Sequence, residues 1–268
     1  MPVKVDLQAW VGRTETAVDT ITSRQIRQLA ATLDRPLDPD HLPPLAHWIG
    51  WQYETPMSGL GPDGHTAKGG FLPPVPLERR MWAGGRLQFG GHLMPDEPLS
   101  RRSEIVKVVE KTGATGPMVF VTVAHTITGQ AGQITEEQDI VYIALPTAFT
   151  PPPPQPSPAN PDWAETLQAD APCLFRFSAL TFNAHRIHYD LPYATGVEHY
   201  PGLVTHGPLQ AMALLTAAVA RSGRMPTAYR YRGVRPAFAG PLTLAAWGNT
   251  LATINPEGLQ CLTAEVTW

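Results

Sequence analysis

Two neighbouring stretches organise this sequence: TFNAHRIHYD at Thr181–Asp190 and PGLVTHGPLQAMALL at Pro201–Leu215. The first places an amide, two imidazoles, a guanidinium and a carboxylate within ten residues. The second turns at His206-Gly207-Pro208 into an apolar run, which predicts a buried helix from Pro208 to about Arg221, ended by Gly223. A polar, histidine-rich segment facing a helix start suits acid–base chemistry beside an anion-stabilising helix end.

The composition is that of a folded protein with a sparsely charged surface. Hydrophobic residues make up 43% of the 268 residues and charged residues 16%, and the net charge of -3 argues against nucleic acid as the main partner. Cys173 and Cys261 form neither a CxxC motif nor a disulfide framework, which favours buried thiols in a reducing compartment. Because residues 1–15 lack the apolar core of a signal peptide and no run of about 18 apolar residues occurs, we expect a cytoplasmic protein without a membrane span.

The first half predicts helices, a long loop and an antiparallel meander. Helical spacing covers Asp19–Leu33 with Ser23 as the N-cap, and a short buried helix is expected within Leu42–Tyr53. The Gly- and Pro-rich segment Glu54–Pro76 predicts a surface loop, which is either part of a binding site or a tolerated insertion. Four strands are expected within residues 79–93, 97–113, 116–129 and 134–145, where apolar residues alternate and glycines stand at the turns.

The second half begins after a proline-rich segment. Pro151–Pro161 contains seven prolines and predicts an extended linker. The apolar run Cys173–Leu180 predicts a short strand. Three further strands are expected at Thr227–Phe238, Leu242–Leu251 and Leu259–Trp268.

A short pattern recurs in both halves. Arg86-x-x-Phe89-x-Gly91-x-Leu93 is repeated as Arg235-x-x-Phe238-x-Gly240-x-Leu242, with the proline-rich segment between the copies. We therefore expect an α+β fold made of two similar units, each with one central helix and an antiparallel sheet, and the two sheets pairing edge to edge.

These features together resemble the MaoC-like double hot-dog hydratases. The segments that carry the resemblance are TFNAHRIHYD, VTHGPLQ at the helix start, and LPPVPLERRMWAGGRLQF in the first half. The group with the strongest resemblance comprises the type 2 hydroxyacyl-thioester dehydratases and the mesaconyl-C4-CoA and itaconyl-CoA hydratases. The resemblance implies a non-catalytic hot-dog unit at residues 1–148, a linker at 149–170, and a catalytic unit at 171–268.

The wider family carries an Asp-x-Asn-Pro-x-His motif before the central helix. Its Asp position falls on Asn183, its Asn on His185, its Pro on Arg186 and its His on His188. The helix-start glycine, whose N–H is implied to hold the thioester carbonyl, falls on Gly207. This chain thus departs from the commoner Asp/His pair, as the dehydratase and mesaconyl hydratase group does.

The resemblance implies catalytic roles for Asn183, His188 and Gly207. Imidazole titrates near neutrality, so His188 can exchange the proton. Asn183 cannot titrate in this range but can hold the water, and the Gly207 N–H can stabilise the developing oxyanion. His185 is either a substrate contact or a structural neighbour of His188, and His206 either contacts substrate or hydrogen-bonds locally.

Cations are needed for the phosphates of coenzyme A and for any second carboxylate. The substrate-binding candidates are His185, Arg186, His206, Arg230, Arg232 and Arg86, with Arg79, Arg80 and Arg235 as further cations. A zinc site at His185-x-x-His188 is the alternative, but the spacing matches no strong zinc pattern and no cysteine partner is near. We expect no metal.

The predicted activity is that of a hydro-lyase adding water reversibly to an enoyl-CoA, with a short branched dicarboxylic thioester as the implied substrate. Two alternatives are an acyl-CoA thioesterase on the same fold and a non-catalytic acyl-thioester-binding protein. We expect no cofactor beyond the coenzyme A of the substrate. A homo-oligomer, namely a dimer, is one option, because the sequence does not fix the oligomeric state.

Overall fold

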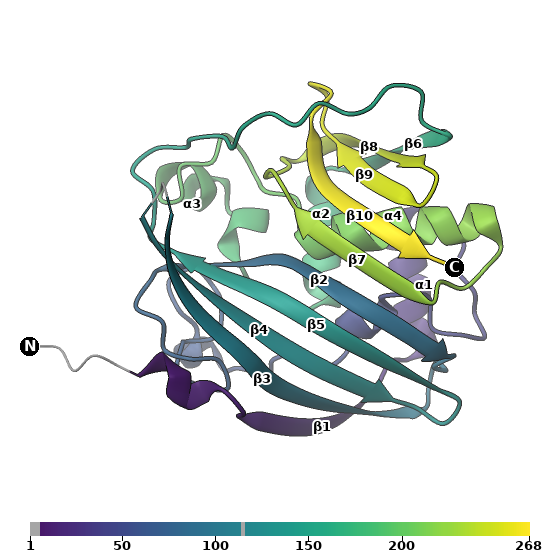
Figure 1. Cartoon of the computed structure of the whole chain (residues 1–268), viewed down its shortest axis with the longest axis horizontal. Coiled ribbons are helices and arrows are strands. Elements are labelled where there is room, and N and C mark those ends of the chain that lie inside the picture. The colour runs from purple at the N-terminus through teal and green to yellow at the C-terminus, as the bar shows by residue number, and fades with distance from the viewer. Residues whose placement is uncertain (1–5, 114–115) are drawn as a thin grey trace, which may run out of the picture.

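Within residues 6–113 and 116–268, which the computed structural model describes, ten strands form one continuous antiparallel sheet (Figure 1). Their order across the sheet is β1-β3-β4-β5-β2-β7-β10-β9-β8-β6, so the first half supplies one side and the second half the other. The strands are β1 (Thr14–Thr20), β2 (Arg79–Gly91), β3 (Pro98–Gly113), β4 (Gly116–Thr128), β5 (Gly132–Ile143), β6 (Trp163–Ala169), β7 (Ala228–Gly233), β8 (Gly240–Trp247), β9 (Thr250–Ile254) and β10 (Gln260–Thr267). The predicted α+β architecture is confirmed.

The two half-sheets join through β2 and β7. Gly84 lies opposite Arg232 and Gly85 opposite Tyr231 in the antiparallel register. A Cβ atom at Gly85 would lie 2.7 Å from the Tyr231 hydroxyl oxygen and 2.9 Å from the carbonyl oxygen of Glu137. The glycine therefore leaves the space in which the Tyr231 ring packs across the junction.

The second half is built around α4. The helices are α1 (Ser23–Leu33), α2 (Ala171–Leu180), α3 (Leu191–Gly196) and α4 (Gly207–Ser222), with single 3-10 turns at Leu7–Trp10, Ala46–Ile49, Met57–Gly59 and Arg186–His188. Every α4 side chain from Leu209 to Ala218 is buried, and the helix packs against β8, β9 and β10. It ends at Gly223, which is left-handed with φ 63°, as the sequence predicts.

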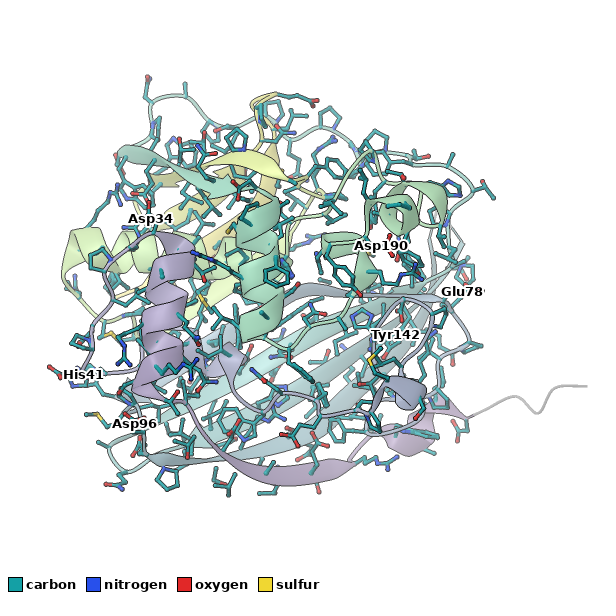
Figure 2. All side chains as sticks on the ribbon, turned by 180° about the vertical axis from the view of Figure 1, so that it is seen from behind. Asp34, His41, Glu78, Asp96, Tyr142 and Asp190 are labelled. Atoms are coloured by element: carbon teal, nitrogen blue, oxygen red, sulfur yellow. The ribbon has the colours of Figure 1, made fainter. Side chains whose placement is uncertain are left out.

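In the described part of the first half, no helix corresponds to α4. Between α1 and β2, residues 34–78 contain only two short 3-10 turns. Helix α1 itself packs beside α2, and Figure 2 shows the two helices next to each other in front of the sheet. The prediction of one central helix in each half is therefore wrong for the first half.

Helix α2 replaces a predicted strand. The apolar run Cys173–Leu180 is equally compatible with both structures, and helix formation is favoured by its N-terminal residues. Asp170 caps the helix by accepting a hydrogen bond from the Cys173 N–H at 3.1 Å, and Pro172 occupies the first turn. The buried residues Cys173, Leu174, Phe177 and Leu180 then lie on one helical face.

Other boundaries also differ from the sequence-based prediction. The N-cap of α1 is Thr22, not Ser23, because Thr22 and Gln25 form a capping box. The expected strand at Leu242–Leu251 is a hairpin of β8 and β9 that turns at Gly248, which has φ 60°. Strand β6 lies within the predicted linker 149–170 and pairs with β8, so only the part before Trp163 is irregular.

The repeated sequence pattern does not mark equivalent positions. Arg86 lies inside β2, whereas Arg235 follows β7. The two halves are related by the order of their strands, and the repeat prediction is wrong in its register. Among the described residues, no helix has the length and apolar character needed to cross a membrane.

Candidate active site

A cavity of about 670 Å³ lies in the first half, where a counterpart of α4 would otherwise pack. Strands β2 to β5 form its floor, residues 47–72 cover it, and α2 with the start of α4 closes one end. Residues from Thr55 to Leu72 line it. This placement favours the binding-site interpretation of the Glu54–Pro76 loop over that of a tolerated insertion.

Asn183 reaches this cavity from the C-terminal end of α2. The chain leaves the helix through Phe182, whose φ of 49° is left-handed, and the Asn183 N–H returns to the Ser178 carbonyl at 2.8 Å. The Asn183 side-chain oxygen accepts a hydrogen bond from the His185 N–H at 3.0 Å. This turn leaves the Asn183 side chain on the cavity wall.

His188 lies one turn further along, in the 3-10 turn Arg186–His188. Its Nδ1 lies 2.7 Å from the Val204 carbonyl oxygen, an acceptor only, so Nδ1 carries the proton and Nε2 keeps its lone pair. Burial lowers the pKa of His188 well below its usual range, and the neighbouring His206 and His185 lower it further. The imidazole is thus neutral near pH 7 and is able to accept a proton.

His206 stacks on His188 and lines the cavity. The two ring centroids are 3.6 Å apart, with an interplanar angle of 19°. His206 Nε2 is 2.9 Å from the Ser178 hydroxyl, whereas its buried Nδ1 has no partner among the described residues. Burial lowers the pKa of His206 to about 3.

Gly207 begins α4 directly after His206. A Cβ atom there would have only the Trp82 carbonyl oxygen within 4 Å, at 3.9 Å, so there is open space beside the helix start. The first N–H groups of a helix have no partner within it, and the helix dipole favours negative charge at that end. Asn183 and His206 thus line one end of the cavity, His188 stacks on His206, and Gly207 lies between the lining residues His206 and Pro208.

His185 is buried behind these residues. Its Nε2 lies 3.4 Å from Glu198 Oε1, and Glu198 also accepts a hydrogen bond from Arg79 Nε at 2.7 Å. Arg79 is therefore used in a buried ion pair, and its guanidinium stacks over the Tyr200 ring. This placement favours the interpretation of His185 as a structural neighbour of His188.

Arg186 holds a loop of the first half against the motif. Its guanidinium pairs with Asp190 and donates to the Pro62 carbonyl at 3.0 Å, and its backbone N–H donates to the Asp63 carbonyl at 2.9 Å. It also lies over the Tyr193 ring, 4.1 Å from the centroid. These contacts indicate a role in holding the two halves together.

Of the remaining predicted arginines, Arg80 lines the cavity, whereas four others lie away from it. Arg230 and Arg232 are exposed on β7, where the alternating Tyr229 and Tyr231 point inward to the core. Arg86, opposite Arg230 in β2, pairs with Glu137 and Asp139 on the same outer face. Arg235 donates to the Pro152 carbonyl at 2.6 Å. The structure does not bring these side chains to the candidate site.

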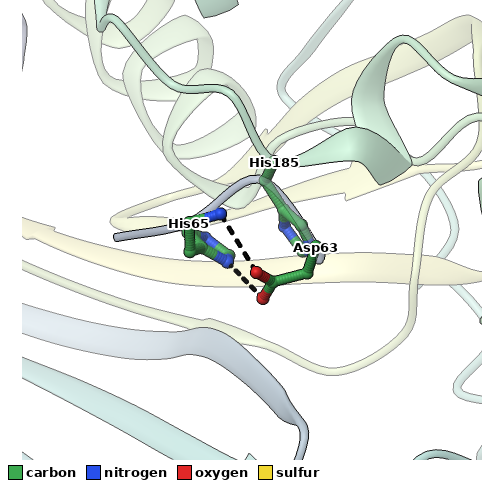
Figure 3. Close-up of side chains that lie close together, drawn as sticks. All are labelled: Asp63, His65 and His185. Carbon is green, nitrogen blue, oxygen red and sulfur yellow. Dashed lines mark hydrogen bonds and ion pairs between the residues drawn. The ribbon is translucent and has the colours of Figure 1, made fainter. Parts of the chain in front are cut away.

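Asp63 and His65 join the site although the sequence did not single them out. Figure 3 shows the Asp63 carboxylate accepting from the His65 Nδ1 at 2.8 Å and from its backbone N–H at 3.0 Å, with His185 beside them. Burial and His185 lower the pKa of His65 to about 4 despite Asp63. These three residues are the one cluster with metal-ligand spacing in the described part of the chain, and it differs from the zinc set considered from sequence. Both oxygens of Asp63 already accept hydrogen bonds from His65, so these two residues form an Asp–His pair. The absence of a metal remains a prediction.

Sequence reasoning also missed a buried polar group at the cavity floor. Glu136 accepts from His47 Nε2 at 2.8 Å, Trp48 Nε1 at 3.0 Å and Gln138 Nε2 at 3.0 Å. Although burial opposes ionisation, the hydrogen bond from His47 helps to hold the pKa of Glu136 below its usual value. The alternation of β5 predicts which residues share a face, but not that this face meets the turn at Ala46–Ile49.

Comparison with known proteins identifies the family. A sequence profile described as hydroxyacyl-thioester dehydratase type 2 matches residues 45–239. The chain belongs to this family. A curated family relative, the mesaconyl-C(4)-CoA hydratase of Chloroflexus aurantiacus, is 42% identical over 97% of both chains. The predicted activity of a hydro-lyase on an acyl thioester is thus confirmed at the level of the family.

Solved structures agree on the fold. A MaoC-like dehydratase from Phytophthora capsici superposes with a TM-score of 0.72, at 12% identity and covering 98% of each chain. A protein of Mycobacterium tuberculosis described as having a double hot-dog fold superposes with a TM-score of 0.56, at 11% identity, covering 96% of this chain and 95% of the other. The predicted double hot-dog fold is therefore confirmed.

Proposed function

We propose that the chain adds water reversibly to a short dicarboxylic enoyl-CoA such as mesaconyl-C4-CoA, giving a 3-hydroxyacyl-CoA. The observation that carries this proposal is that Asn183 and His206 line one end of the cavity, with His188 stacked on His206 and the Gly207 helix start next to it in the chain. The 42% identity to a protein named mesaconyl-C(4)-CoA hydratase supports the acyl class.

In the proposed reaction the oxygen of a water molecule bonds to Cβ of the enoyl thioester. Asn183 holds this water, and His188 Nε2 takes its proton. The electron pair of the double bond moves toward the thioester oxygen, and the imidazolium then returns the proton to Cα. Water is thereby added with no net change in the protonation of the enzyme.

Gly207 would stabilise the charge that develops on the thioester oxygen. Its N–H stands at the positive end of the α4 dipole, and the missing side chain leaves room for the thioester to approach. A single donor of this kind is typically worth about 3 kcal/mol in the barrier.

An activity panel tests the proposal. Purified protein is incubated with mesaconyl-C4-CoA, itaconyl-CoA and crotonyl-CoA, and each product is measured by mass spectrometry together with free thiol. We expect a mass gain of one water without release of thiol. Release of thiol would instead indicate a thioesterase, and binding without turnover would indicate a binding protein. The homodimer, the cytoplasmic location and the lack of a cofactor remain predictions.

A further inference from the structure

One imidazole on the cavity wall has no part in the reaction proposed above. His65 belongs to the loop between the 3-10 turn Met57–Gly59 and β2, and its half-buried side chain lines the cavity. Its Nδ1 and its backbone N–H both donate to Asp63 (Figure 3). Its Nε2 makes no hydrogen bond within the described part of the chain and is not fully enclosed. This nitrogen is therefore free to meet a ligand.

Asp63 determines which nitrogen of His65 carries the proton. Although burial opposes ionisation, the hydrogen bond from His65 keeps the pKa of Asp63 well below its usual range, so the carboxylate is an acceptor only. Nδ1 must therefore donate to Asp63 Oδ2, at 2.8 Å. Because a neutral imidazole has one N–H, Nε2 keeps its lone pair. His65 thus offers the cavity a hydrogen-bond acceptor in a fixed orientation.

One side of the His65 loop packs against the motif. A Cβ atom at Gly64 would lie 1.9 Å from the carbonyl oxygen of Ala184, the residue after Asn183. The centroids of the His65 and His185 rings are 4.0 Å apart. Since Asn183 and His65 both line the cavity, they lie on neighbouring parts of its wall.

The other side of the loop faces β2 near the start of α4. The Thr66 carbonyl accepts a long hydrogen bond of 3.4 Å from Arg80 NH2. Arg80 and Trp82 both line the cavity from β2, and two residues along a strand span about 7 Å. The Trp82 carbonyl oxygen is the atom nearest to a Cβ placed on Gly207, at 3.9 Å. His65 therefore lies between the motif and the strand that borders the helix start.

The proposed reaction leaves one proton of the attacking water without an acceptor. His188 takes the first proton, and the second stays on the oxygen and becomes the hydroxyl proton of the product. Asn183 Oδ1 already accepts from the His185 N–H at 3.0 Å, and the amide nitrogen of Asn183 makes no hydrogen bond within the described residues. Asn183 is thus best placed to donate to the water oxygen. The second proton requires an acceptor from elsewhere.

We propose that His65 is a further catalytic residue, whose Nε2 accepts a hydrogen bond from the attacking water, and that Asp63 is its positioning residue. This inference rests on the proposed function and deepens it, because the first half then contributes to the chemistry. His188 remains the group that moves the proton, and His65 accepts from the 3-hydroxyl group in the product. With both protons of the water directed to acceptors, the oxygen is oriented for attack on Cβ.

The test measures hydration of mesaconyl-C4-CoA by His65→Ala and Asp63→Asn. The single oxygen of an asparagine would be needed by the His65 backbone N–H, so its amide nitrogen would face Nδ1 and the ring proton would move to Nε2. We expect kcat to fall about ten- to hundredfold in both variants, with KM changed less than about threefold.

A second Asp–His pair in the chain provides matched controls. Asp38 Oδ2 lies 2.9 Å from His41 Nδ1, and both residues are outside the set that lines the cavity. His41→Ala and Asp38→Asn remove the same groups from an exposed pair, so both should keep the wild-type kcat.

Two further measurements distinguish this role from a structural one. Imidazole added to His65→Ala should restore part of the rate in proportion to its concentration, because the cavity can admit it. Nitrogen NMR of protein with labelled histidines should show the proton of His65 on Nδ1 in the wild type and on Nε2 in Asp63→Asn.

Wild-type kcat in a folded His65→Ala protein would overturn the catalytic role. So would a loss that imidazole does not restore, combined with a wild-type rate in Asp63→Asn. Hydration that a chelator abolishes and Zn²⁺ restores would replace the role with a metal site at Asp63, His65 and His185. Wild-type protein that hydrates no enoyl-CoA would instead reject the proposed function, and this role with it.

Discussion

The two halves of the sheet use the same arrangement of strands for different purposes. In the second half α4 fills the concave face with a nearly continuous set of buried side chains. In the first half the corresponding space is a cavity covered by the irregular residues 47–72. In the described part of the chain, the lack of a second such helix therefore leaves a cavity beside the motif that we propose to be catalytic.

The largest effect is expected from the core of α4. Leu214 is fully buried in the helix, so Leu214→Ala should lower the free energy of unfolding by about 2–5 kcal/mol. Leu60 lines the cavity and is only half-buried, so Leu60→Ala should cost less than about 1 kcal/mol. Urea unfolding of both variants measures the difference, and equal losses would contradict the contrast between a packed and an open half.

The contact between the halves should show an intermediate effect. Gly64 has φ +87°, and a Cβ atom there would lie 1.9 Å from the Ala184 carbonyl oxygen, next to Asn183. Gly64→Ala should therefore move the loop or the motif, cost about 1–3 kcal/mol of stability and lower the hydration rate. Gly70→Ala in the same loop meets nothing within 4 Å and serves as the control. Wild-type stability and rate in Gly64→Ala would show that the loop does not position the motif.

Acid should weaken both halves gradually. Burial lowers the pKa of His65 and His125 to about 4 and that of His206 to about 3. The unfolded chain binds these protons near pH 6.5 and the native chain only at lower pH, so unfolding takes up protons between these values. The free energy of unfolding should decrease as the pH falls from about 6.5 to 4, by up to about 1.4 kcal/mol per pH unit for each histidine.

Chemical denaturation between pH 7.5 and 4.5 measures this slope. His125→Asn removes one of these groups and should make the slope shallower. A free energy of unfolding that stays constant or rises on acidification would contradict the assignment of neutral, buried imidazoles.

Local patterns predicted much of the scaffold. Alternation of Val119, Val121 and Val123 predicted β4, and Pro208 with Gly223 predicted the limits of α4. The prediction of a strand at Cys173–Leu180 was wrong because a short apolar segment has no periodicity that separates a strand from a helix. The N-cap at Asp170, which favours a helix, was not considered. The hairpin of β8 and β9 was missed because its turn at Gly248 interrupts an otherwise apolar segment.

The candidate site was only partly predictable for a different reason. Asn183, His188 and Gly207 lie close together in sequence, so their proximity followed from a single motif. Asp63 and His65 reach the site from a distant segment, and no local pattern reports such contacts. Arg230 and Arg232 were predicted to bind substrate because of their charge, but both are exposed on the outer face of β7. Which face they occupy depends on the packing of Tyr229 and Tyr231 in the core, which the charge does not reveal.

The most direct test of this account compares the hydration of mesaconyl-C4-CoA by wild type and His188→Ala at equal concentrations. A general acid–base group contributes about 10²- to 10⁴-fold, so we predict a loss of kcat in that range with the circular dichroism spectrum unchanged. The mass gain of one water should appear with wild type and be almost absent with the variant. Near-wild-type turnover by a folded His188→Ala protein would contradict the assignment of the chemistry to the second half.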